Sequence, residues 1–256
     1  MMKKLLLAIL VTLSLNAGDN VVVGAGVYSH TQPYKGMGEK VIPTPVFFFD
    51  NALFYARWAQ FGVYFLGDKK DDLSWGFSLT AQPNPYGYSS SDSSYLIGME
   101  DRKSSWEGGI DFIMESKKGW FELTYFHDIL GVTQSNSYVA QVGTTFHLGD
   151  FRFDPIAVAR YNDSKYNNYY YGVRANEATF SRAYYEAKGA MVATAQTYIT
   201  YPISKHFVII SNFRADYLGS EISKSSITDT NARYSGMLSI AYKFSYSKTK
   251  DYFFGR

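Results

Sequence analysis

The sequence predicts an all-β protein: an antiparallel transmembrane β-barrel of about twelve strands, with ten strands as the alternative. Three observations favour this fold. They are an export signal at the N-terminus, long segments in which apolar and polar residues alternate, and connections that alternate between short and long. The composition agrees, because aromatic residues make up 18% of the 256 residues, and Tyr and Phe favour pleated surfaces and the aromatic girdles of outer-membrane barrels.

The N-terminal segment 1–17 has the order of a secretory signal peptide. Lys3 and Lys4 are followed by the apolar run 5–15, and small residues surround the end of the segment at Ala17. Such a run is too short to stay in a bilayer as a spanning helix. We therefore expect cleavage after Ala17 and a single barrel domain over 18–256.

The rest of the composition excludes several classes of protein. No second stretch approaches the roughly 20 apolar residues that a membrane helix needs, and there is no Cys to form a disulfide, bind a metal or carry a lipid. Loss of Lys3 and Lys4 would reduce the 25 Lys and Arg to 23, equal to the 23 Asp and Glu. A mature chain without a basic surplus argues against nucleic acid as a partner.

Alternation with a period of two is the strongest signal in the chain. It is clear in four segments: 106–115, 137–148, 206–218 and 233–244. Their lengths match the 9–11 residues of a tilted membrane strand and exceed the usual 5–6 of soluble sheets. A soluble β-sandwich is the alternative, but it would either expose the aromatic residues or bury the charges of the polar faces in a dry core. These charges are Asp111, Glu115, Arg214 and Asp216.

The connections between these segments alternate in length. Short turns occur at 116–118, 149–150 and 203–205, and longer polar stretches at 83–105, 128–136, 162–188 and 219–232. Outer-membrane barrels have short periplasmic turns and long external loops, so both termini are expected in the periplasm. The predicted strands lie near 21–29, 44–50, 52–58, 60–66, 75–82, 106–115, 119–127, 137–148, 151–161, 189–201, 206–218 and 233–245.

Two features of this assignment stay open. No clear turn divides the segment 52–66, and one bulged strand there would reduce the count toward ten. The connection 162–188 is too long for a simple turn and holds a helix-compatible run at 176–188, so we expect it to fold into the mouth or the lumen of the barrel.

Charged residues on the polar faces should project into the lumen, where water tolerates them. The candidates are Asp111, Glu115, Glu122, Arg152, Arg160, Arg214 and Asp216. We expect them to pair and fill a narrow barrel, and the alternative is a small polar conduit.

Three motifs lie in order along the chain. The first, Tyr-x-Gly followed by Pro-x-Pro, contains Tyr34, Gly36, Pro43 and Pro45. The second, Tyr-Tyr-Gly-Val followed by Glu-Ala, contains Tyr171, Gly172, Val173 and Glu177. The third is matched in part, by Tyr217, Leu218 and Gly219. With these motifs in this order, nearly the whole mature chain resembles the MipA/OmpV family of outer-membrane proteins.

The resemblance implies a location in the outer membrane of a Gram-negative bacterium and a role as a scaffold for murein-processing enzymes. The partners that it implies are outer-membrane lipid and a periplasmic murein hydrolase or synthase. Contact with the enzyme would be made by the short turns or by the tail after Phe244. The alternative function is a narrow channel or a solute-uptake barrel acting through the inward charges.

No constellation of residues predicts an enzyme, a metal site or a cofactor. The four histidines, His30, His127, His147 and His206, lack the paired spacing of a zinc site. Ser211 and His206 fall about 17 Å apart on one strand, too far for proton transfer. An outer-membrane hydrolase is therefore a third hypothesis that no residue singles out.

Overall fold

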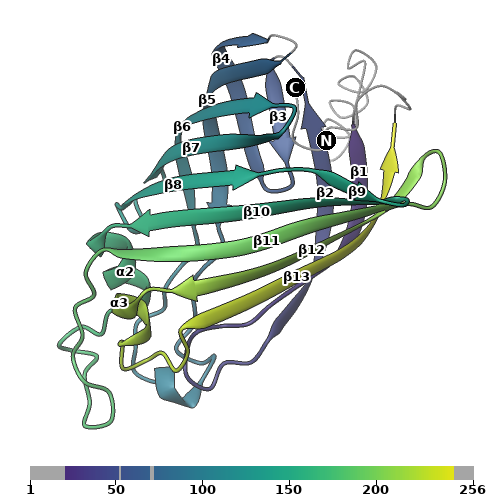
Figure 1. Cartoon of the computed structure of the whole chain (residues 1–256). Coiled ribbons are helices and arrows are strands. Elements are labelled where there is room, and N and C mark those ends of the chain that lie inside the picture. The colour runs from purple at the N-terminus through teal and green to yellow at the C-terminus, as the bar shows by residue number, and fades with distance from the viewer. Residues whose placement is uncertain (1–20, 52, 70–71, 245–256) are drawn as a thin grey trace, which may run out of the picture.

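The computed structural model describes residues 21–51, 53–69 and 72–244. Its strands are β1 (Val22–His30), β2 (Lys40–Asp50), β3 (Phe54–Arg57), β4 (Gln60–Lys69), β5 (Leu73–Asn84), β6 (Ser105–Ser116), β7 (Gly119–Asp128), β8 (Asn136–Gly143), β9 (Phe146–Leu148), β10 (Phe151–Asn162), β11 (Ala190–Pro202), β12 (Phe207–Leu218) and β13 (Ala232–Lys243). They form one antiparallel sheet that closes into a barrel where β10 pairs with β11 (Figure 1). Within the described ranges, no helix has the length and apolar character needed to cross a membrane.

The prediction of twelve strands is confirmed, because β8 and β9 are two parts of one strand. Both pair with β10 in the same register, with Gly143 opposite Ile156 and Phe146 opposite Phe153. The break between them faces Pro155, which has no N–H to donate to the ladder. The ten-strand alternative is wrong.

The ambiguous segment 52–66 forms a short hairpin. Trp58 and Ala59 are the two turn residues that join β3 to β4. Trp58 has a φ of 57°, in the left-handed region that residues other than glycine rarely adopt. The turn lacks the Asn-Gly or Asp-Gly that marks most two-residue hairpins. The two predicted strands are therefore present, although no turn signal in the sequence separates them.

Side chains alternate between the outer and inner faces of the barrel wall. On β12, Phe213 and Tyr217 are exposed on the outer face, whereas Asn212 and Asp216 are buried inside. The wall is therefore apolar outside and largely polar inside, the reverse of a soluble protein. Lipid around a membrane-spanning barrel requires this arrangement.

An apolar layer crosses the lumen toward the end with the short turns. This lumen plug consists of Val22, Val46, Phe48, Ile156, Tyr198, Val208, Ile210, Met237 and Ala241. The ring centroids of Phe48 on β2 and Tyr198 on β11 are 6.2 Å apart, although β12, β13 and β1 separate the two strands in the sheet. Contact between side chains from such distant strands means that the plug narrows the lumen at this level, where a pocket of about 90 Å³ remains beside Ile156 and Tyr198.

The long connections fold together into a cap over the opposite end (Figure 1). They contain the 3-10 helix η1 (Ser94–Leu96) and the helices α2 (Ser164–Tyr171) and α3 (Ser220–Ser223). The core of the cap consists of Tyr34, Tyr88, Leu96, Met99, Tyr166, Tyr170, Tyr171, Val173, Ala190, Val192, Leu218, Ile222 and Ile227. Both ends of the barrel interior are thus covered by packed side chains.

The helix expected at 176–188 is absent. The segment instead forms isolated bridges, which pair Val173 with Tyr185 and Thr179 with Arg182. The helix of this connection is α2, whose first turn is capped by Asp163 through a 3.0 Å bond from the N–H of Tyr166. Contacts with the neighbouring cap segments outweigh the local propensity of 176–188.

Truncation of the lumen plug should destabilise the barrel. Phe48→Ala is expected to lower the free energy of unfolding by about 3–5 kcal/mol, because it leaves a cavity among packed side chains. Urea unfolding of the protein in phospholipid vesicles, followed by heat-modifiable gel migration, measures the change. The control Phe48→Leu should lose less than about 1.5 kcal/mol. Equal stability of Phe48→Ala and the wild type would contradict the packing of the plug.

Candidate functional site

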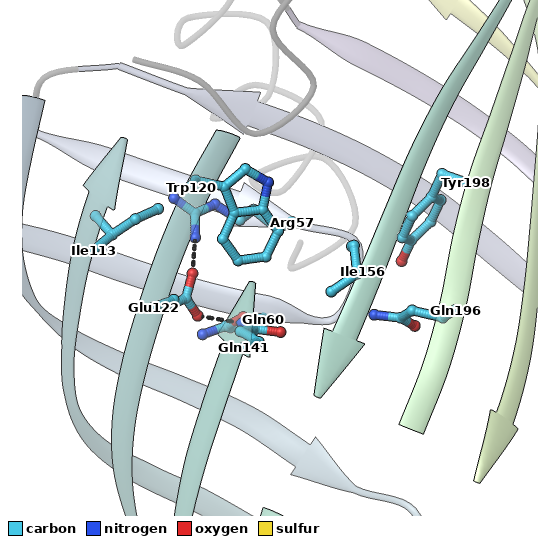
Figure 2. A pocket seen from close by; sticks show the side chains of 9 residues that line it. All are labelled: Arg57, Gln60, Ile113, Trp120, Glu122, Gln141, Ile156, Gln196 and Tyr198. Atoms are coloured by element: carbon cyan, nitrogen blue, oxygen red, sulfur yellow. Dashed lines mark hydrogen bonds and ion pairs between the residues drawn. The ribbon is translucent and has the colours of Figure 1, made fainter. Parts of the chain in front are cut away.

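An ion pair spans the lumen between β3 and β7. Nη1 of Arg57 lies 3.0 Å from Oε2 of Glu122, and both side chains are almost fully buried (Figure 2). Three strands, β4 to β6, separate them in the sheet. Arg57 also contacts Asp50 at 3.2 Å, and Gln141 on β8 donates to Glu122 at 2.6 Å. Loss of one partner would leave a buried unpaired charge, which costs about 3–5 kcal/mol, so the pair ties two parts of the wall together.

Two further arginine clusters face the interior closer to the cap. Arg160 on β10 pairs with Glu107 on β6, and β7 and β8 lie between these two strands in the sheet. Asp216 on β12 accepts from two arginines, at 2.7 Å from Nε of Arg214 and at 2.6 Å from Nη2 of Arg233. Arg214 and Asp216, both predicted from the sequence to face the lumen, are thus in direct contact.

The remaining sequence candidates lie elsewhere on the inner face. Asp111 is fully buried and accepts from Oγ1 of Thr124 at 2.8 Å. Arg152 lies 2.8 Å from Asp154 near the short turn that follows β9. Glu115 is half-buried near the short-turn end of β6.

Four partners of these residues were missing from the sequence-based set: Arg57, Glu107, Asp154 and Arg233. Glu107, Asp154 and Arg233 occupy polar positions of alternating strands, so the same parity rule identifies them. Arg57 precedes the turn at Trp58, which no glycine marks in the sequence. The sequence therefore did not show whether the Arg57 side chain faces the lumen or the lipid.

A cavity of about 390 Å³ lies between the lumen plug and the cap. Its size falls in the range of small-molecule sites. Its charged lining residues are Arg57, Arg160, Arg214, Arg233, Glu107, Glu122 and Asp216. Four arginines face three carboxylates in the lining, and Asp50, just outside it, also pairs with Arg57. The positive excess is therefore local, at Arg214 and Arg233, which share Asp216.

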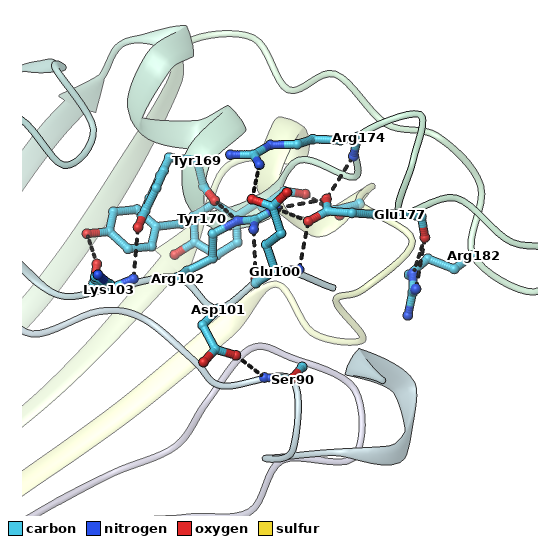
Figure 3. A network of polar contacts seen from close by, with 12 residues as sticks. Ser90, Glu100, Asp101, Arg102, Lys103, Tyr169, Tyr170, Arg174, Glu177 and Arg182 are labelled. Atoms are coloured by element: carbon cyan, nitrogen blue, oxygen red, sulfur yellow. Dashed lines mark hydrogen bonds and ion pairs between the residues drawn. The ribbon is translucent and has the colours of Figure 1, made fainter. Parts of the chain in front are cut away.

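A second buried network holds the cap together (Figure 3). Nη2 of Arg102 donates to both carboxylate oxygens of Glu177 at 2.8 Å, and both side chains are almost fully buried. Backbone N–H groups of Glu100 and Arg174 donate to the same carboxylate at 2.9 and 3.0 Å. Arg182 donates to the carbonyl of Glu177 at 2.8 Å. This cap clamp joins the connection after β5 to the connection after α2.

The residues considered for catalysis do not form a site. His206 stacks on Tyr242 at the short-turn end, with ring centroids 5.4 Å apart. Ser211 lies on the outer, lipid-facing side of β12. In the part of the chain that the structure describes, no group of three or more His, Cys, Asp or Glu could hold a metal ion.

Comparison with known proteins places this barrel in a family. The sequence model of "MltA-interacting protein MipA" matches residues 23–244, which include all the described strands apart from the first residue of β1. The chain belongs to the MltA-interacting protein MipA family.

Curated relatives in this family cover most of the chain. The chain is 26% identical over 228 residues to the putative outer membrane protein YiaT of Escherichia coli. The aligned region covers 87% of this chain and 90% of the relative. The chain is 29% identical to outer membrane protein OmpV of Vibrio cholerae over 70% of this chain and 69% of the relative. It is 27% identical to the MltA-interacting protein of Escherichia coli over 95% of this chain and the whole relative. The protein is accordingly an outer-membrane β-barrel.

Most residues of the family motifs lie in the cap. Tyr34, Tyr171, Val173 and Leu218 belong to its core, and Glu177 is the centre of the cap clamp. Their roles here are packing and charge pairing. Tyr217, by contrast, points outward from β12.

The glycines of the motifs lie where the backbone has little freedom or space. Gly36 has a φ of +70°, which strains a residue with a side chain. A Cβ at Gly172 would lie 2.4 Å from the carbonyl oxygen of Asn168, and one at Gly219 2.5 Å from that of Met191. Pro43 and Pro45 lie on β2, outside the cap.

Removal of the clamp carboxylate should open the cap while the barrel stays folded. Glu177→Gln leaves Arg102 buried without its carboxylate, which costs about 3–5 kcal/mol. We expect trypsin to cleave after Lys103 and Arg174 at least tenfold faster in this variant. Glu186→Gln, on an exposed residue of the same connection, is the matched control. Equal cleavage rates in the two variants would contradict the clamp.

The clamp should also make the cap sensitive to acid. Burial raises the pKa of Glu177, but hydrogen bonds from the N–H groups of Arg174 and Glu100 and from Arg102 outweigh it, so the pKa lies below its usual value. A lowered folded pKa stabilises the cap above the unfolded value of about 4.3, and this stability is lost as the pH falls through the folded pKa. Near-ultraviolet circular dichroism of the buried tyrosines should therefore decrease below about pH 4. Glu177→Gln should abolish that step, whereas Glu186→Gln should keep it.

Proposed function

We propose that the protein is a non-enzymatic, non-conducting scaffold of the outer membrane, which binds a periplasmic murein hydrolase or synthase. The observation that carries the proposal is that packed side chains obstruct the interior toward both ends of the barrel. The lumen plug, the cross-lumen ion pairs and the cap leave the cavity enclosed at both ends of the barrel. A barrel of this kind works through its outer surfaces rather than through an aqueous pore.

The short-turn end supplies the surface for such a partner. Exposed charged residues gather on the turns of this end, among them Lys117, Lys118, Asp72, Asp150 and Lys205. The ion pair between Lys117 and Asp72 is also exposed, so it is worth less than about 1 kcal/mol and can be exchanged for a contact with a partner. The relative named MltA-interacting protein aligns over 95% of the chain, which supports a murein enzyme as that partner. The tail after Phe244, the other expected contact surface, lies outside the described residues.

Crosslinking tests the scaffold and the end at which it acts. A photoreactive amino acid at Lys118 or Lys205, in cells of the native host, should crosslink to a murein hydrolase or synthase identified by mass spectrometry. The same group at Glu186, in the cap, is the control and should give no such product. Crosslinks to a murein enzyme from the cap alone, or from neither end, would overturn the proposal.

Conductance separates the scaffold from the channel. In planar bilayers the heat-modifiable protein should give no steady ion-conducting steps. Steps whose size changes in Arg214→Gln would support a channel lined by the inward charges and reject the non-conducting scaffold.

A further inference from the structure

The barrel wall has a gap next to the cap, between β2 and β5. β2 pairs with β3 only at Phe48, Phe49 and Asp50, and β5 has no partner on β4 beyond Ala81. The β3–β4 hairpin stops part-way along the wall, while β2 continues toward the cap (Figure 1). We call this gap the wall window; its frame is 40–46 of β2, the hairpin turn, and 82–84 of β5. At the turn, three strand spacings separate β2 from β5, or about 14 Å.

Prolines line the β2 side of the window. The carbonyl of Phe47 accepts from the N–H of Trp58 at 2.9 Å, so the backbone groups of Phe47 point toward β3. Backbone groups alternate in direction along a strand. Those of Pro43 and Pro45, at two-residue intervals from Phe47, therefore point to the same side, into the window. Neither proline has an N–H to leave unpaired there.

The backbone groups on the β5 side of the window alternate in direction in the same way. The N–H of Tyr64 on β4 bonds to the carbonyl of Leu53 at 2.8 Å, toward β3. The alternation turns the backbone groups of Phe61 toward β5, where its partner is Ala81. Pro83, two residues beyond Ala81, thus has its nitrogen at the window edge.

The three prolines make the window a permanent part of the wall. An unpaired N–H in hydrocarbon costs several kcal/mol, and Pro43, Pro45 and Pro83 remove three such donors. An edge that has lost these donors also pairs poorly with a further strand. The sequence therefore encodes an opening where a continuous sheet would otherwise form.

The wall beside the window has the apolar outer surface expected of a wall that faces lipid, and the window frame lines the cavity. Beside the window, the outward side chains of Val27, Val41 and Trp106 are apolar and exposed. Its inner frame, including Ile42, Thr44, Trp58, Ala59, Gln82 and Pro83, belongs to the lining of the 390 Å³ cavity. The plug and the cap cover the two ends of this cavity, so the window is the side from which a molecule in the membrane reaches it.

The cavity has an apolar side at Trp58 and Tyr28, which we call the shelf, and a cationic side at Arg214 and Arg233. Trp58 packs edge-on against Tyr28 with ring centroids 5.2 Å apart, and its Nε1 donates to Thr44 at 3.2 Å. Arg214 shares Asp216 with Arg233, and 30% of its side chain is exposed toward the cavity. A guanidinium in such a position favours an anionic oxygen group, and the shelf favours a chain of methylenes.

We propose that the cavity binds an anionic single-chain amphiphile, which enters sideways from the membrane through the wall window. Its charged headgroup lies on Arg214, and its chain lies along Ile42 and Trp58 with the far end in the hydrocarbon. This binding site is separate from the periplasmic surface of the proposed scaffold and does not depend on it.

Photolabelling with a fatty acid tests the site. The protein is reconstituted in phosphatidylcholine nanodiscs and exposed to palmitate that carries a diazirine in its chain. Labelled residues are mapped by mass spectrometry. We expect saturable labelling of Ile42, Trp58 or Tyr86, competed by unlabelled palmitate. A fatty alcohol probe of the same chain length should label these residues about tenfold less at equal concentration, because it lacks the charge.

Two variants separate the headgroup site from the window. Arg214→Gln should raise the half-saturating palmitate concentration about tenfold, whereas the control Arg174→Gln, on an exposed cap arginine, should leave it unchanged. Ile42→Trp should block labelling inside by filling the window. Heat-modifiable migration must be normal for each variant. Labelling confined to outward residues such as Val41, labelling that palmitate does not compete, or an Arg214→Gln variant that saturates normally would overturn the proposal.

Discussion

Hydrogen bonding of the backbone in lipid is the constraint on which the rest of this structure depends. Hydrocarbon offers no partner to an exposed N–H or C=O, so a sheet in the membrane must close on itself. The pairing of β10 with β11 provides that closure. The same constraint explains the wall window, where β3 and β4 are missing. This gap is bordered by Pro43, Pro45 and Pro83. These residues remove the donors that closure would otherwise have to satisfy.

Closure also encloses charged side chains inside the barrel, where they need partners. A narrow lumen cannot hydrate isolated charges as bulk water does, so each needs a partner close by. Arg57 reaches Glu122, and Arg160 reaches Glu107, from strands that are not neighbours. These contacts brace the wall from within. They also occupy the space that a porin would leave open, and together with the lumen plug they move the functional surfaces to the turns and the wall window.

The motifs that relate the chain to its family therefore describe how the barrel is built. Tyr34, Tyr171 and Val173 pack the cap, and Glu177 closes it through Arg102. The Pro-x-Pro motif borders the window. These residues have defined structural roles in the barrel and its cap.

The sequence by itself determined the barrel and the polarity of its two faces, and it predicted about twelve strands with ten as the alternative. Strand periodicity is local, because each side chain alternates with its neighbours whatever lies across the sheet. Turn lengths are local as well. The family resemblance likewise led to the outer membrane without any coordinates.

Only the tertiary structure decided which charges meet, and where the wall is open. Arg57 and Glu122 are 65 positions apart in the chain, and no local pattern relates them. The turn at Trp58 carries no glycine signal, so the sequence left open whether this segment forms two strands or one, and it gave no sign of the window beside the hairpin. The segment 176–188 follows the same logic: its backbone pairs within the cap because Glu177 and Arg182 bind distant segments there. Contacts between residues far apart in sequence override local propensity wherever burial makes them strong.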